Sequence, residues 1–90
     1  MKFRKKPIVI EAMQLTRNFA EKVIMWIQEN GGEIPEFNLG EFNEAPQYIE
    51  IKTLEGMMIA HENDYIVKGI QNEFYPVKEE IFIKTYERVE

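Results

Sequence analysis

The chain has 90 residues, no cysteine and a formal net charge of −5, with 44% hydrophobic and 30% charged residues. This composition is typical of a folded globular protein, and the length predicts a single domain over residues 1–90. The lack of cysteine excludes disulfides, thiolate metal sites and cysteine nucleophiles, and the lack of serine excludes the commonest acyl-transfer nucleophile.

Charge is distributed unevenly along the chain. The first ten residues carry four basic and no acidic side chains, whereas residues 11–90 carry 7 basic and 16 acidic ones. Such an acidic surface repels phosphate backbones, so nucleic acid is an unfavourable partner. The basic segment offers one alternative site, in which Arg4, Lys5 and Lys6 bind an anionic small ligand or nucleotide. A simpler interpretation is that these cations are solvated, or neutralise acids of their own domain.

Residues 7–14 have the alternation and β-branched content of a strand. Ile8, Val9 and Ile10 make both faces apolar at its start, which favours a central position in a sheet. Pro7 suits the first strand position, where no ladder donor is needed.

A helix is predicted over residues 18–29. Asn18 and Glu21 have the spacing of a capping box, and apolar residues then recur at helical intervals. Glycine after Asn30 is suited to a left-handed helix cap. Trp26 is interpreted as a core residue packed against the sheet, with stacking on a ligand as the alternative.

Residues 31–47 contain glycine, proline and acidic residues without a sustained period, and loops of this length are often functional. Their apolar side chains either pack over the sheet or form a surface for a partner protein. We expect this segment to be the contact surface, with Phe37, Leu39, Phe42, Glu41 and Glu44 as candidate partner-binding residues.

The second half of the chain reads as strands joined by short turns, at 48–54, 57–61, 64–70 and 73–77. Gly56 supplies the positive φ of a tight hairpin, and Gln71 with Asn72 marks a second turn. Pro76 restricts its strand to a sheet edge. Residues 79–86 begin with acids and have Lys84 near their end, which predicts a short C-terminal helix.

Few residues offer chemistry. His61 is the one histidine, and a single imidazole cannot make the multi-histidine sites that zinc prefers. Glu62 and Asp64 next to it are the nearest approach to an acid/base constellation, but carboxylates beside a turn usually stay ionised and hydrated. No glycine-rich phosphate loop is present. We therefore expect no catalytic residue, metal or cofactor, and no enzymatic activity.

Several segments together resemble a group of small uncharacterised proteins encoded by bacteriophages and prophages of Gram-positive bacteria. They are RKKPIVIEA at 4–12, YIEIKTLEG at 48–56, DYIVKG at 64–69, EFYP at 73–76, and IF and TYE at 81–82 and 85–87. Many similar sequences have cysteine at the position of Val77, so an activity that depended on that cysteine would be missing here. The resemblance implies phage origin and residence in the host cytoplasm, and implies no activity.

The predicted fold is therefore α+β: a mostly antiparallel sheet of about five strands with one packed helix and a short C-terminal helix. No apolar run approaches the ~20 residues of a membrane span, and the first residues lack the apolar centre of a signal peptide, so a cytoplasmic location is expected. A non-enzymatic protein-binding module with a host or phage partner is the leading functional hypothesis. A homodimer through a sheet edge or through the aromatic loop of residues 31–47 is a further expectation. The predicted core consists of Ile8, Ile10, Val23, Trp26, Ile27, Ile49, Ile51, Ile66, Val67, Phe74, Phe82 and Tyr86.

Overall fold

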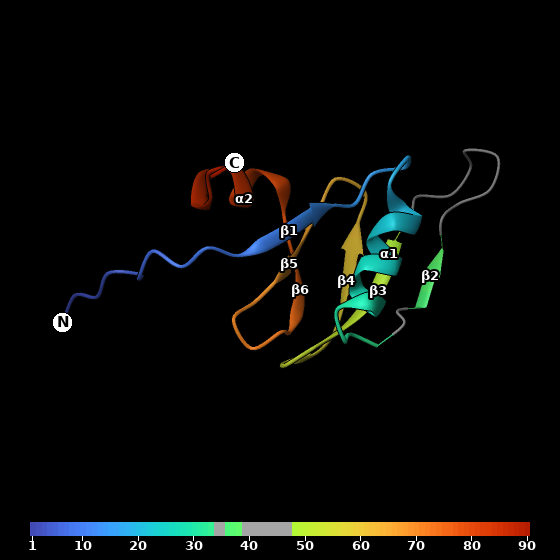
Figure 1. Cartoon of the computed structure of the whole chain (residues 1–90), viewed down its shortest axis with the longest axis horizontal. Helices are drawn as coiled ribbons and strands as arrows, with labels where there is room; N and C mark the ends of the chain where they lie inside the picture. Colours follow the sequence, from blue (N-terminus) through green and yellow to red (C-terminus); the bar gives the residue numbers. More distant parts are fainter. Residues whose placement is uncertain (34–35, 39–47) are drawn as a thin grey trace.

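The computed structural model describes residues 1–33, 36–38 and 48–90, which form six strands and two helices (Figure 1). In chain order these are β1 (Glu11–Gln14), α1 (Ala20–Glu29), β2 (Glu36–Asn38), β3 (Tyr48–Thr53), β4 (Gly56–His61), β5 (Tyr65–Lys68), β6 (Phe74–Val77) and α2 (Glu79–Thr85). All strand pairs are antiparallel, which confirms the predicted α+β class with one packed helix and a short C-terminal helix.

The described strands form two three-stranded sheets in the orders β1-β5-β6 and β2-β3-β4. Strand β6 lies beside β3 and β4, but no ladder joins the two sheets. The prediction of a central first strand was wrong, because β1 lies at an edge of its sheet and, among the described strands, pairs with β5 alone. The strand also begins at Glu11, since its ladder with β5 starts at the pair Glu11 and Lys68. Pro76 lies on the edge strand β6, as predicted.

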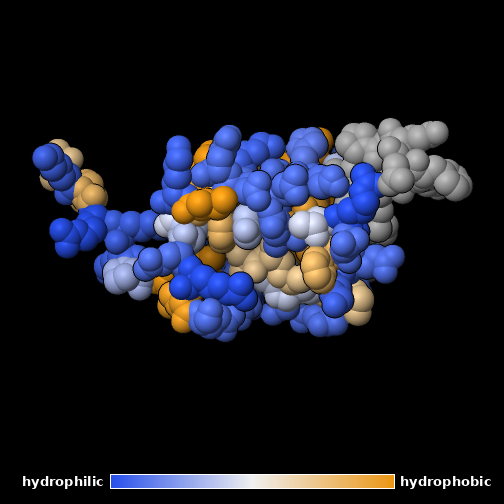
Figure 2. Space-filling model, turned by 90° about the horizontal axis from the view of Figure 1, so that it is seen from above, coloured by the Kyte–Doolittle hydropathy of each residue, from blue (hydrophilic) through white to orange (hydrophobic). Residues whose placement is uncertain are grey.

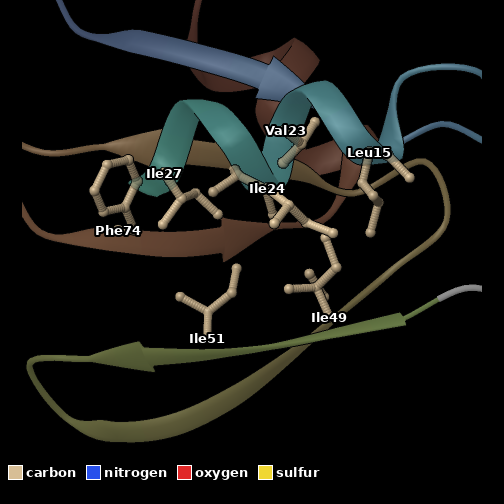
Figure 3. Close-up of a cluster of buried hydrophobic side chains, with 10 residues drawn as sticks. Leu15, Val23, Ile24, Ile27, Ile49, Ile51 and Phe74 are labelled. Carbon is tan, nitrogen blue, oxygen red and sulfur yellow. The ribbon is translucent and has the colours of Figure 1, made fainter. Parts of the chain in front are cut away.

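Helix α1 packs against both sheets and supplies the centre of the core (Figure 3). Its buried residues are Ala20, Val23, Ile24 and Ile27. They pack against one face of each sheet, where the fully or almost fully buried side chains are Ile49, Ile51, Ala60, Ile66 and Phe74, with Leu15 from the segment before the helix. Burial of these aliphatic side chains is the main source of stability in a domain of this size.

The predicted core is largely correct, with one error and several omissions. Ile8 was wrongly placed in it: its side chain is 51% exposed, because the chain before Glu11 has no strand beside it. Ile10, Trp26, Phe82 and Tyr86 are partly buried. Four core residues were not predicted, namely Leu15, Ala20, Ile24 and Ala60.

The ends of α1 follow the sequence prediction at one terminus only. At the C-terminal end Gly31 has φ +87°, in the left-handed region that glycine favours. At the N-terminal end the predicted capping box was wrong. Phe19 is the N-cap residue and no side chain caps the helix, because Asn18 belongs to a turn in which the Phe19 N–H donates to the Thr16 carbonyl oxygen at 3.1 Å. Gly56, with φ +110°, forms the β3–β4 hairpin turn as predicted.

The face of the β1-β5-β6 sheet that lies away from α1 is covered by α2. Ring contacts make this layer: Tyr65 stacks on Phe82 with 3.9 Å between ring centroids, and Phe82 contacts Tyr86 at 4.8 Å. Burial, together with a hydrogen bond to the Tyr86 hydroxyl group, raises the pKa of Tyr75 to about 12. Val67 is fully buried on this same face, since it alternates with Ile66 along β5.

Candidate protein-binding surface

Strand β4 combines an unpaired edge with exposed apolar side chains. Among the described strands it forms a ladder only with β3. Met57, Met58 and Ile59 are 61%, 41% and 49% exposed, and no charged residue interrupts the strand from Gly56 to Ala60. Natural proteins usually protect such an edge with charge, proline or a bulge. An edge without this protection can accept an extended segment of another chain.

A groove adjoins this strand. It has a volume of about 340 Å³ and lies between the β3–β4 hairpin and β6. Met58 of β4 contributes to its wall, together with Leu54 and Glu55 of the hairpin turn and Tyr75 and Pro76 of β6. Because side chains alternate along a strand, Met58 borders the groove while Met57 and Ile59 point to the opposite face of the sheet. An extended segment beside β4 would therefore find an apolar contact on each face.

The surroundings of β4 are acidic. Glu55 is exposed directly before the strand, and Glu50 of β3 lies opposite Ile59 in the ladder. The nearest cation on β3, Lys52, forms an ion pair with Glu33 at 3.2 Å. This edge is thus complementary to a partner segment that is apolar at its centre and basic at its ends.

Met57, Met58 and Ile59 were not among the predicted site residues. Their strand was predicted correctly, but the contact surface was predicted in residues 31–47. Of the five candidates there, Phe37 is described as a backbone position of β2 that pairs with Ile49. Leu39, Glu41, Phe42 and Glu44 lie outside the described residues. The available signal for β4 was three successive large apolar residues without a charge.

The proposed anion-binding residues lie on an exposed segment. Residues 1–10, here called the basic arm, precede β1 and project from one end of the molecule (Figures 1 and 2). Lys5 reaches the end of α2, with its Nζ 3.4 Å from the Tyr86 hydroxyl oxygen and 5.0 Å from the ring centroid. Arg4 and Lys6 are exposed, and neither of the two described cavities is lined by any of these three cations.

His61 and Asp64 lie close together, but their contacts are those of a structural turn. The buried Asp64 carboxylate accepts a hydrogen bond from the His61 backbone N–H at 2.9 Å and lies 3.4 Å from the Lys78 Nζ. The His61 ring Nδ1 is 4.0 Å from the same carboxylate oxygen, and Glu62 pairs instead with Arg17 at 3.6 Å. Asp64 thus joins the end of β4 to the residue before α2, and no nucleophile accompanies it among these contacts.

Within the ranges that the structure describes, no three acidic or histidine side chains gather into a group that could hold a metal ion. Neither described helix has the length and apolar character needed to cross a membrane. No protein-family model, curated protein or solved structure matches the chain.

Proposed function

We propose that this chain is a non-enzymatic, protein-binding accessory protein of bacteriophage or prophage origin that acts in the host cytoplasm. It binds an extended segment of a host or phage protein along the free edge of β4. The resemblance of residues 4–12 and 48–87 to phage proteins supports the origin and location, and the surface of β4 supports the mode of binding.

The observation that carries the binding mode is the uncharged edge strand with exposed Met57, Met58 and Ile59. Main-chain hydrogen bonds along a free edge provide affinity, and side-chain pockets on alternate positions provide selectivity. Methionine side chains are flexible and polarisable, so they adapt to different apolar side chains of a partner. The acidic residues around the strand select a segment with basic ends.

The test is capture of a partner with a charged edge variant and a matched control. Tagged wild-type protein, Ile59→Lys and Ile83→Lys are exposed to extract of phage-infected host cells, and retained proteins are identified by native mass spectrometry. Ile59 is 49% exposed on β4 and Ile83 is 63% exposed on α2, so both substitutions add one cation at an exposed apolar site. The proposal requires a protein held at fixed stoichiometry by the wild type and by Ile83→Lys, and lost from Ile59→Lys.

A second pair of variants separates the two candidate surfaces. If residues 31–47 make the contact, Phe37→Ser with Phe42→Ser abolishes capture while Ile59→Lys leaves it unchanged. Hydrogen exchange of the purified complex then shows whether amides of β4 or of residues 31–47 gain protection. The proposal is contradicted if the wild type retains no partner protein, or if the wild type and all variants retain it equally.

A further inference from the structure

The basic arm contains a strand-forming sequence that has no strand beside it. Ile8, Val9 and Ile10 are consecutive β-branched residues, yet Ile8 and Val9 are 51% and 74% exposed. They continue the line of β1, whose ladder with β5 ends at Glu11 and Lys68 because the chain turns at Gly69. Between this part of the arm and the β5–β6 turn a hollow of about 190 Å³ is left open.

Strand β1 also has an unpaired outer edge over its whole length. In the sheet order β1-β5-β6 its one ladder partner among the described strands is β5. Ile8–Ile10 and β1 together therefore make a continuous edge of seven residues, 8–14, with apolar side chains exposed at one end. Before it, the Ile8 N–H donates to the Lys6 carbonyl oxygen at 2.9 Å, a local turn around Pro7.

We infer that this edge pairs with the same edge of a second copy of the chain. Antiparallel pairing about a two-fold axis joins the two three-stranded sheets into one continuous sheet and covers Ile8 and Val9 of both copies. This interface lies on the β1-β5-β6 sheet and is separate from the β4 edge on the other sheet, so it extends the proposed function with a self-association surface.

Charge complementarity supports a second copy as the occupant. With the two-fold axis at Val9, an extended arm places Arg4 of one copy opposite Gln14 of the other, and with the axis at Ile10 it places Lys6 there. Gln14 donates a hydrogen bond to the Glu79 carboxylate at 2.7 Å, and Glu80 follows it in α2. Each basic arm thus meets acids at the start of the other copy's α2, although both chains have a net charge of −5.

The direct test measures self-association of the full chain by sedimentation equilibrium. The Leu15 N–H points to β5, so by alternation the N–H of Ile10 points to the outer edge. Ile10→Pro removes this donor and should weaken dimerisation at least about tenfold, which corresponds to ~1.4 kcal/mol. Phe3→Pro is the matched control, because Phe3 is also in the arm but lies outside the paired residues. Far-ultraviolet circular dichroism should be unchanged in both variants, since both positions lie outside the helices and strands.

Two further sets of variants test the geometry of the paired edges. Lys5→Glu with Lys6→Glu should weaken the dimer, and adding Glu79→Lys with Glu80→Lys should restore it. Because the chain has no cysteine, Val9→Cys or Ile10→Cys should form a disulfide-linked dimer with oxidised glutathione, since opposed strand residues lie within disulfide reach. Phe3→Cys should form much less. A chain that remains monomeric up to about 1 mM, or a dimer that tolerates Ile10→Pro, would overturn the inference.

Discussion

The two faces of the β1-β5-β6 sheet are covered by helices that differ in what they bury. Helix α1 buries four residues against Ile66 and Phe74, whereas α2 has no buried residue of its own. On the α2 side the contacts are stacked rings, Tyr65 on Phe82 and Phe82 beside Tyr86. The difference shows that complete aliphatic burial is concentrated on the α1 face, while α2 is held by partly exposed aromatic contacts and should be the easier helix to detach.

The largest expected effect is on the α1 face. Ile27 is 2% exposed, so Ile27→Ala should lower the free energy of unfolding by about 2–5 kcal/mol through lost burial and a remaining cavity. Met25 lies on the same helix but is 55% exposed, and Met25→Ala should change stability by only about 0.5 kcal/mol. Urea denaturation measures both. Equal losses in the two variants would mean that burial of the inner side of α1 does not determine stability.

A smaller loss of stability is expected at Asp64, which joins the end of β4 to the residue before α2. Asp64→Ala removes the acceptor of the partly buried His61 backbone N–H and the partner of Lys78, so stability should fall by about 1–3 kcal/mol. Glu62→Ala serves as the control, because the ion pair of Glu62 with Arg17 is partly exposed to water. If Asp64→Ala were as stable as Glu62→Ala in thermal denaturation, the turn would not join β4 to α2 energetically.

The α2 face should respond more weakly still. Phe82→Ala removes the central ring between Tyr65 and Tyr86 and should cost about 1–2 kcal/mol, below the 3–5 kcal/mol of a fully buried ring, because Phe82 is only partly buried. Hydrogen exchange should show lost protection in α2 while α1 stays protected. Loss of protection in both helices together would mean that the two faces unfold as one unit.

The smallest effect is a change in pH dependence. The pKa of Tyr75 rises from 10.0 to about 12 in the folded state, so the folded protein retains this proton to higher pH than the unfolded chain. The resulting stabilisation is fully present below pH 10.0 and is lost as pH rises towards about 12. Tyr75→Phe should therefore lose less stability than the wild type over this alkaline interval in urea titrations. Parallel curves for the two proteins would rule out this contribution.

Local sequence patterns predicted the individual elements of this fold well, but they did not predict which elements lie next to each other. The hairpin at Gly56, the edge position of Pro76 and the charges of α2 depend on residues close in sequence, and all three were correct. The error at Ile8 has a different cause. Ile8–Ile10 and Ile66–Val67 show the same doubly apolar pattern, but only β5 has a strand on each side. Whether a partner strand is available depends on the chain's topology, which the local pattern does not contain.

The candidate site was harder to predict than the core. Both β3 and β4 contain large apolar residues. Those of β3 are buried and most of those of β4 are exposed, because β4 lies at an edge of its described sheet beside an open groove. Leu15 was missed for a related reason: it follows the last residue of β1, where its N–H donates to the Asp64 carbonyl oxygen at 2.8 Å, and it is buried by the junction rather than by a regular element.

The antiparallel ladder between β1 and β5 also has a consequence for how the chain folds. Hairpins β3–β4 and β5–β6 join neighbouring segments, so they can form early, whereas β1 must wait for residues 65–68. During synthesis β1 leaves the ribosome long before its partner strand does. For that interval the sequence Ile8–Gln14 is an unpaired, strand-forming segment. The four cations ahead of it have the position of gatekeeper residues, whose like charges oppose aggregation of such segments.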